Sequence, residues 1–212
     1  MPRISGASLE EHRGRTNARI FAAMTRLLGE RGYDAMTLAD IATTAGLART
    51  AMYNYYPDKE SLLIAFTAHE TASYLERLDA ELDTVSTPID RLRVFIRIQL
   101  DHLATRHIGA GSVAGVLSED GERRMAEHIA PLADRLRAII RAGVEQRYLA
   151  AEDVDLLVPL VTATIAGRST ADLTADRLEH AIDATTSYVL RGLGARVGKD
   201  GKARRLPASA AD

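Results

Sequence analysis

The pattern of apolar and polar positions predicts helices along almost the whole chain. Its most informative stretch is residues 37–59, TLADIATTAGLARTAMYNYYPDK, where apolar residues recur every three or four positions on both sides of a glycine. One short helix is expected over Thr37–Thr44, with the Thr37 hydroxyl as its N-cap, and the chain then turns at Gly46. A second short helix follows over Ala48–Asn54 and ends before Pro57. Two short helices joined by a glycine-containing turn are typical of a helix-turn-helix that reads DNA.

Longer amphipathic helices are expected on both sides of this motif. One precedes it over Thr16–Arg31, and the others follow it over residues 58–83, 89–106, 121–148, 155–168 and 174–192. Residues 107–119 hold three glycines between short apolar pieces, which predicts a short helix within loops. No segment alternates between apolar and polar residues as a half-buried strand does. The sequence therefore predicts an all-α fold of about nine helices.

These elements group into four segments. Residues 1–14 are expected to form a flexible arm and residues 15–57 a three-helix DNA-binding domain. Residues 58–194 are expected to form a second, helical domain. The end of the chain, residues 195–212, is rich in Gly, Lys, Arg and Ala without any periodicity, which predicts a flexible tail.

Composition narrows the class of protein. With 46% apolar and 26% charged residues, the chain is too apolar to be disordered and is ordinary for a globular protein. No run approaches the roughly 18 apolar residues of a membrane span, and the N-terminus lacks the apolar segment of a secretory signal. The chain has no cysteine, which excludes disulfides and thiolate metal sites. We therefore expect a cytoplasmic protein without a metal or cofactor.

The net charge of −2 argues against a protein that coats nucleic acid by bulk attraction. Any contact with DNA must come from a local basic patch. Arg13, Arg15 and Arg19 cluster before the predicted motif, and Arg49 and Lys59 lie on or beside its second helix. A solvated face is the alternative interpretation of these charges, but their position beside a helix-turn-helix favours phosphate contact.

Seven residues of this region are candidates for DNA contact. Some carry a hydroxyl, phenol or ammonium that can bind a phosphate oxygen, and others lie where they can reach base edges. The phosphate candidates are Thr37, Tyr53, Tyr55 and Lys59, and the base candidates are Arg49, Thr50 and Asn54. Core packing is the alternative for Tyr53 and is the favoured interpretation for Tyr56.

The segment Arg15–Leu62 resembles the DNA-binding domain of the TetR family of bacterial transcription regulators. Its first helix ends in the family's Gly-aromatic pair, here Gly32 and Tyr33, and its Thr-Leu-x-x-Ile-Ala-x-x-Ala-Gly run extends from Thr37 to Gly46. The family's closing aromatic cluster and Lys-Glu pair correspond to Tyr53, Tyr55, Tyr56, Lys59 and Glu60.

Two positions depart from that family pattern. Ala48 stands where a capping Ser or Thr often begins the recognition helix, and Ala51 stands where a small hydroxyl residue is common. Both departures remove a possible hydrogen bond to phosphate, so the family's contacts cannot be transferred as a complete set.

The last two expected helices predict a homodimer. Residues 155–168 are almost continuously apolar or small, and a helix that is apolar all round is buried on every side. The TetR resemblance implies that this helix and the next meet their symmetry mates in a four-helix bundle, so that a dimer reads a pseudo-palindromic operator in double-stranded DNA. Packing within one chain is the alternative. The expected interface residues are Leu157, Leu160, Val161, Thr164, Leu178, Ala181, Ile182, Thr185 and Val189.

The resemblance also implies a small-molecule effector inside the helical domain that changes DNA affinity. Polar residues among apolar ones can orient such a ligand. The pocket candidates are His69, Phe95, Gln99, His102, Tyr148, Thr162 and Arg168. For each polar candidate, an ordinary hydrogen bond in the core or at the surface is the alternative interpretation.

Other classes of protein fit less well. His102 and His107 are five residues apart, which does not match the i, i+4 spacing of a helical metal site. No nucleophile elbow, glycine-rich phosphate loop or paired-carboxylate motif supports an enzyme. A helix-turn-helix regulator without a small-molecule ligand stays open as the second hypothesis. The sequence thus predicts a ligand-responsive transcription regulator, most simply a repressor.

Overall fold

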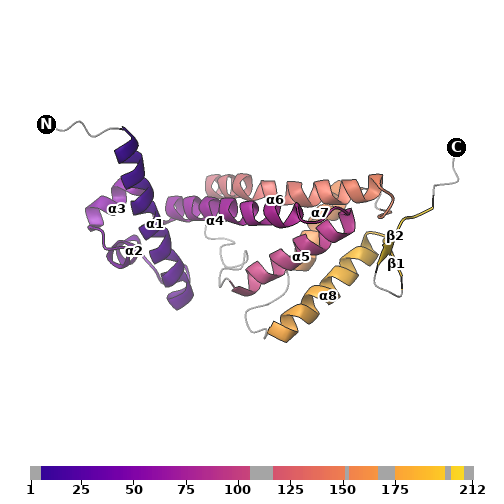
Figure 1. The fold of residues 1–212 in the computed structure, drawn as a ribbon. Coiled ribbons are helices and arrows are strands. Elements are labelled where there is room, and N and C mark those ends of the chain that lie inside the picture. Colours follow the sequence, from indigo (N-terminus) through magenta and orange to yellow (C-terminus); the bar gives the residue numbers. More distant parts are fainter. Residues whose placement is uncertain (1–5, 106–116, 151–152, 167–174, 199–201, 208–212) are drawn as a thin grey trace. The chain divides into compact units, whose positions relative to one another are not determined.

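The structure, a computed structural model, describes residues 6–105, 117–150, 153–166, 175–198 and 202–207. It is helical, as the apolar periodicity predicts (Figure 1). The helices are α1 (Gly6–Arg31), α2 (Leu38–Thr44), α3 (Arg49–Tyr55), α4 (Lys59–Leu82), α5 (Pro88–Thr105), α6 (Glu119–Glu145), α7 (Val154–Ala166) and α8 (Ala175–Gly192). The described residues therefore hold eight helices rather than about nine. The short helix expected over residues 107–119 lies almost entirely outside them.

The chain divides into two compact units whose borders lie inside long helices. The N-terminal unit extends to His69, within α4, and also takes the start of α6 up to Met125. The C-terminal unit begins at Glu70 and takes α6 again from Ala126 onward. A border at residue 57 was expected from the break at the proline, but α4 and α6 each contribute residues to both units.

Helix α1 begins much earlier than the sequence pattern predicts. It starts at Gly6, so residues 6–14, which were expected to belong to a flexible arm, are helical. Good helix formers and an i, i+4 ion pair between Arg15 and Glu11 favour this extension. The apolar stripe that marks a helix begins only later, at the fully buried Ile20 and Met24, so periodicity alone misses the first turns.

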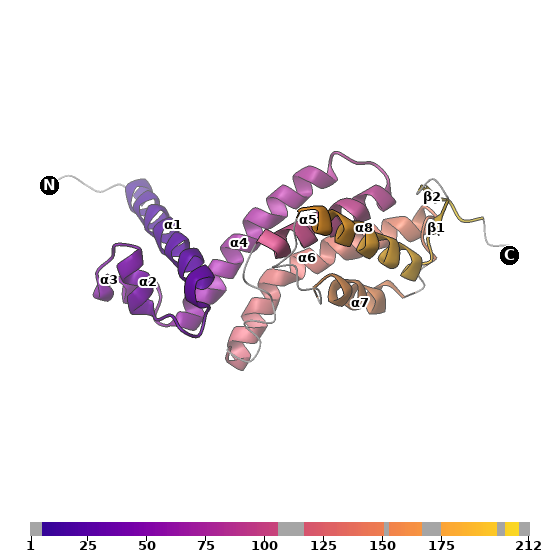
Figure 2. The ribbon, with the colours of Figure 1, turned by 90° about the horizontal axis from the view of Figure 1, so that it is seen from below.

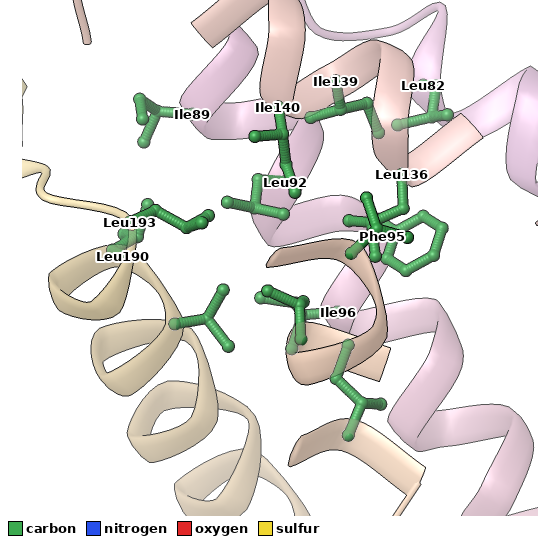
Figure 3. Close-up of a cluster of buried hydrophobic side chains, with 14 of the residues drawn as sticks. Leu82, Ile89, Leu92, Phe95, Ile96, Leu136, Ile139, Ile140, Leu190 and Leu193 are labelled. Carbon is green, nitrogen blue, oxygen red and sulfur yellow. The ribbon is translucent and has the colours of Figure 1, made fainter. Parts of the chain in front are cut away.

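The core of the C-terminal unit is a layer of aliphatic side chains between helices (Figure 3). Leu92, Ile96 and Leu100 of α5 are fully buried, and they pack with Leu136 and Ile140 of α6. Leu190 and Leu193 close the layer from the end of α8. The stripe predicted for residues 89–106 is therefore confirmed as the centre of this unit.

The expected flexible tail contains a small β-hairpin. Strand β1 (Arg196–Val197) pairs antiparallel with β2 (Ala203–Arg204). Beyond β2, the Leu206 N–H donates to the Arg147 carbonyl at 2.6 Å, which fastens the chain to the end of α6. Two-residue strands are too short to show an alternating pattern, so the hairpin could not be predicted from the sequence.

Candidate nucleic-acid interface

Helix α2 begins with a reciprocal cap. The Thr37 hydroxyl accepts a hydrogen bond from the Asp40 N–H at 3.2 Å, and the Thr37 N–H donates to the Asp40 carboxylate at 2.9 Å. The Thr37 hydroxyl also donates to the same carboxylate at 2.7 Å. These bonds lower the pKa of Asp40 and confirm Thr37 as the N-cap. A phosphate contact from this hydroxyl would have to replace its bond to Asp40.

The turn between α2 and α3 depends on Gly46 and Arg19. Gly46 has a φ of 66°, a conformation that favours glycine. One terminal nitrogen of Arg19, on α1, donates to the carbonyls of Ala45 and Gly46 at 2.6 and 2.8 Å. Arg19 was expected in a phosphate-binding patch, but its guanidinium holds this turn in the structure.

Helix α3 has one buried position and a continuous exposed face. Met52 is fully buried against the N-terminal unit. Arg49, Thr50, Tyr53 and Asn54 are all exposed, and their i, i+1, i+4 and i+5 spacing puts them on one side of the helix. The structure thus brings together the three base candidates and one phosphate candidate. This face carries a guanidinium, a hydroxyl, a phenol and an amide, all able to hydrogen-bond DNA.

The end of α3 is fixed against α1 by two aromatic side chains. Tyr56 is buried, its hydroxyl donates to the Asn17 side-chain oxygen at 3.2 Å, and burial raises its pKa. The core interpretation of Tyr56 is therefore confirmed. Tyr55 is half-buried, and the Arg13 guanidinium lies 5.7 Å from its ring centroid. Arg13 and Tyr55 together bring a cation and a phenol to the edge of the α3 face.

Lys59 lies at the first position of α4 and binds its own chain. Its ammonium donates to the carbonyls of Tyr33 and Met36 at 3.1 and 3.2 Å and lies 4.2 Å from the Tyr33 ring centroid. Burial raises the pKa of Tyr33 to about 12, which keeps this phenol neutral. One of the three ammonium protons is left for a phosphate. The structure gives Lys59 a role in holding the α1–α2 loop that the sequence did not indicate.

Polar side chains also gather inside the C-terminal unit, where two of the expected effector-binding residues meet. The Tyr74 hydroxyl donates to the Gln99 side-chain oxygen at 2.5 Å, and the His102 ring meets Tyr74 edge-on at 4.8 Å between centroids. Burial lowers the pKa of His102 and raises that of Tyr74. Phe95, one turn before Gln99, is buried in the same core.

The other pocket candidates lie elsewhere. His69 is exposed, belongs to the N-terminal unit and stacks on Phe21 at 5.0 Å. Tyr148 lies beneath the Arg205 guanidinium beside the hairpin. Thr162 is exposed and donates to the Val158 carbonyl of its own helix. Arg168 lies outside the described residues. Gln99 and His102 are the two candidates that the structure brings to one aromatic side chain, Tyr74.

The expected dimer interface also needs correction. Val161, Ala181, Ile182, Thr185 and Val189 are buried inside their own chain, each at most 6% exposed. Such residues have almost no surface left to offer a second copy. Leu157, Thr164 and Leu178 are intermediate, and Leu160 alone of the set is well exposed, at 62%. The sequence missed two further exposed apolar side chains on these helices, Leu156 and Tyr188, at 67% each.

Three residues of these sites were not predicted from the sequence. Asp40 completes the α2 cap, and the Thr-x-x-Asp spacing is a recognisable variant of the capping box. Tyr74 completes the cluster with Gln99, and a phenol on the inner stripe of a long helix was its only signal. Asn17 had none, because its contact with Tyr56 is 39 residues distant along the chain.

These features define a class of protein. A capped helix, a glycine turn held at φ 66° and a short helix with an exposed polar face form a helix-turn-helix DNA-binding domain. Residues 20–66 match the family described as "Bacterial regulatory proteins, tetR family". This part of the chain is therefore a TetR-family DNA-binding domain, as the resemblance of residues 15–62 indicates.

Relatives extend the match beyond this domain. The chain is 28% identical over 197 residues to the HTH-type transcriptional regulator BetI of Rhizobium meliloti (strain 1021), covering 89% of this chain and 93% of that one. It is 26% identical over 177 residues to the HTH-type transcriptional repressor KstR of Mycolicibacterium smegmatis, covering 77% and 83%. The crystal structure of the regulator FadR from Bacillus subtilis in complex with stearoyl-CoA has the same fold, with a TM-score of 0.72, 20% identity and coverage of 82% and 98%.

The described residues also lack two kinds of feature. No helix among them is both long enough and apolar enough to cross a membrane. Within the same residues, no group of three or more His, Asp or Glu side chains is arranged to hold a metal ion.

Proposed function

We propose that this protein is a homodimeric repressor that binds a pseudo-palindromic operator and leaves it when a small molecule binds the C-terminal unit. Its place of action is then the bacterial cytoplasm, where the operator is. The observation that carries this proposal is the exposed face of α3, formed by Arg49, Thr50, Tyr53 and Asn54. The repressor KstR is among the relatives, which supports repression rather than activation.

On this face, Arg49 and Asn54 are the specificity residues. Arg49 lies in the first turn of α3 and can form two hydrogen bonds to the O6 and N7 atoms of a guanine. Asn54, at the other end of the face, can pair in the same way with an adenine. The Thr50 methyl can contact thymine, and Tyr53, with its phenol 45% exposed, can bind a phosphate. Arg13 and Tyr55 add a second phosphate contact beside it.

Dimerisation in this proposal uses the outer stripe of α7 and α8. Leu156 and Leu160 are one turn apart on α7 and more than 60% exposed, and Tyr188 is equally exposed on α8. Ala163 and Ala184, also exposed, continue the two stripes with small side chains that allow close helix approach. A second copy would bury these apolar groups, each of which favours association by about 25 cal/mol per Å² removed from water.

The effector would bind beside Tyr74, Gln99 and His102. These polar groups lie within an apolar core, where they can orient a ligand by hydrogen bonds. The fold shared with FadR, a protein that binds stearoyl-CoA, supports the presence of a small-molecule site in this unit. A ligand acts as an effector only if it binds the DNA-competent and DNA-incompetent states with different affinity.

A regulator that needs no small molecule is the second candidate. It is favoured by the hydrogen bond between Tyr74 and Gln99, because each side chain already satisfies the other without a ligand. The two functions differ in one measurement. An effector-responsive protein binds its operator less tightly when the effector is added, whereas the second candidate has the same operator affinity in every small molecule tested.

Selection of bound sequences from random double-stranded DNA tests the proposed function. The purified wild-type protein should enrich one pseudo-palindrome whose half-sites are about one helical turn apart. Binding to the enriched sequence should weaken steeply with salt, because phosphate contacts release counterions. Failure to enrich any sequence, with equally weak binding to all duplexes, would contradict a sequence-specific regulator.

A further inference from the structure

A groove lies between α5 and α8, apart from the polar cluster around Tyr74. The two helices run antiparallel and side by side (Figures 1 and 2). They leave a groove of about 620 Å³, to which Val197 of β1 also contributes. This volume lies within the range of about 300–1,000 Å³ that is typical of small-molecule sites.

The floor of this groove is apolar. Val94 of α5 and Ile182 and Leu190 of α8 line it, and the latter two are 4% and 2% exposed. These side chains belong to the same aliphatic layer that forms the core of the C-terminal unit. The floor is therefore rigid and can accept a short hydrocarbon chain.

Polar groups with no protein partner line the wall formed by α8. Thr186 is only 7% exposed, yet its hydroxyl has no hydrogen-bond partner among the described residues. The side chains of Ser187 and Arg191, which also line the groove, have no hydrogen bond or ion pair within the same part of the chain. The Thr186 hydroxyl is not among the fully buried atoms that lack a partner, so it is accessible from the groove and can donate to a bound acceptor.

Charge is distributed unevenly along the groove. At one end, the Arg97 guanidinium binds both oxygens of Glu179 at 2.6 and 2.9 Å, and Asp183 adds a further carboxylate. Toward the β1 end, Arg191 of α8 lines the groove without an ion pair among the described residues, whereas Arg93 of α5 lies 3.5 Å from Asp90. Arg191 therefore gives this end a positive charge that no carboxylate of the described residues pairs with, one turn from the Ser187 hydroxyl on α8.

We propose that this groove binds a small amphipathic anion, a carboxylate or phosphate monoester with a short alkyl chain. The anionic group accepts hydrogen bonds from Arg191, Thr186 and Ser187, and the alkyl chain covers Ile182 and Leu190. Charge-assisted bonds from a guanidinium and hydroxyls satisfy a carboxylate or a phosphate equally well in geometry. This site does not depend on the proposed DNA-binding function, because every group in it belongs to the C-terminal unit.

Isothermal titration calorimetry on the full-length protein tests the site with hexanoate, hexyl phosphate and hexanol. We expect the two anions to bind and hexanol not to bind, and the tighter anion identifies the preferred head group. Arg191→Gln should weaken anion binding about tenfold or more, the loss of one charge-assisted hydrogen bond. Thr186→Val, which keeps the side-chain volume, should weaken it by a smaller factor.

Arg196→Gln is the matched control, because it removes the same charge from β1 at a position that does not line the groove. Its affinity for both anions should equal that of the wild-type protein. If Arg191→Gln and Arg196→Gln lose equal affinity for the anions, the site is overturned, and the anions are attracted to a basic surface in general. The site would also be overturned if neither anion binds the wild-type protein, or if Gln99→Leu rather than Arg191→Gln abolishes anion binding.

Discussion

Lys59 and Arg19 lie beside the recognition helix, yet both direct their charge to carbonyls of their own chain. Lys59 binds the carbonyls of Tyr33 and Met36, and Arg19 binds those of the turn after α2. Arg15 pairs with Glu11, so Arg49 on α3 and Arg13 beside Tyr55 are the members of the predicted basic patch without a hydrogen bond or ion pair among the described residues. This explains how a chain with a net charge of −2 can present a local basic face.

Replacing Lys59 separates its internal role from any phosphate contact. Lys59→Met keeps the aliphatic stem but leaves two carbonyls without their donor, so unfolding free energy should fall by about 1–3 kcal/mol. Urea denaturation measures this loss. Fluorescence anisotropy on the selected operator measures the second role, since a lost phosphate contact lowers the salt slope by about one. If Lys59→Met has the stability of wild type and a lower salt slope, the role of Lys59 in holding the α1–α2 loop is contradicted.

The cap of α2 makes stability depend on acid pH. Hydrogen bonds from Thr37 hold the pKa of Asp40 below its ordinary value of 3.8. The stabilisation is therefore complete above pH 3.8 and is lost as the pH falls through the lowered folded-state pKa.

Asp40→Asn should be less stable than wild type at pH 7, and the difference should shrink as the pH falls below the pKa of Asp40. Urea denaturation at several pH values measures it. Asp34→Asn, at an exposed carboxylate with no hydrogen bond among the described residues, is the control. A difference between Asp40→Asn and wild type that stays constant at all pH values would contradict the cap's charge dependence.

At this scale the sequence predicted which side chains are exposed better than it predicted what they bind. The exposed face of α3 could be predicted because helical spacing places its residues on the side opposite the buried Met52. The partners of Lys59 and Tyr56 lie 23 to 39 residues away, and no local pattern encodes contacts at such separations.

Among the elements, α4 and the start of α6 are joined by one carboxylate. Glu60 accepts hydrogen bonds from the Ser118 N–H at 3.2 Å and the Ser118 hydroxyl at 2.5 Å. The same hydroxyl accepts the Gly121 N–H at 3.1 Å, so it caps α6. A Cβ at position 121 would lie 2.1 Å from a Glu60 oxygen, which means that only glycine leaves room for this arrangement.

Gly121→Ala should therefore destabilise the protein by about 1–3 kcal/mol, because it displaces Glu60 from the cap. In a Glu60→Ala background the same substitution should be neutral or stabilising, since the obstacle is gone and alanine is the better helix former. Urea denaturation of the two single variants and the double variant gives the coupling energy. Additive effects would show that position 121 tolerates a side chain without moving Glu60.

Most helices could be predicted from the sequence to within a few residues, and the exceptions have physical causes. The first turns of α1 carry no apolar stripe because they extend beyond the core that begins at Ile20. The chain after the hairpin is fastened by one backbone hydrogen bond, from Leu206 to Arg147 just after α6, and such a bond leaves no trace in side-chain type. The border between units lies within α4 and α6 because continuous helices serve both.

For the whole molecule, the central assumption is a dimer formed through the outer stripe of α7 and α8. Leu160→Asp puts a charge on a side chain that is 62% exposed, so it should give folded monomers. Val161→Asp buries a charge at a position that is 6% exposed, so it should unfold the chain instead. Sedimentation velocity with circular dichroism distinguishes these results. A Leu160→Asp protein that stays dimeric would contradict this interface.

The sequence indicated these two helices for the interface, which stays a prediction, but several of the side chains it named are buried within the chain. Residues 155–168 have apolar side chains all round, so no polar stripe indicates which side faces the chain's own core. The structure settles it by packing Val158, Val161 and Ile165 inward, which leaves Leu156 and Leu160 outside. For the pocket candidates the limit is similar, because a polar residue on an apolar stripe does not reveal which neighbours it meets.

The central claim is that α3 reads DNA sequence, and selection with Arg49→Ala tests it most directly. Wild type and variant are each used to select bound sequences from random duplex DNA, with Arg26→Ala, an exposed arginine of α1, as the control. We predict that Arg49→Ala loses its preference at one base pair in each half-site and binds the wild-type operator about 1–3 kcal/mol more weakly. Arg26→Ala should select the wild-type operator. Selection of that same operator by Arg49→Ala, with uniformly weaker binding to every duplex, would contradict base recognition by α3.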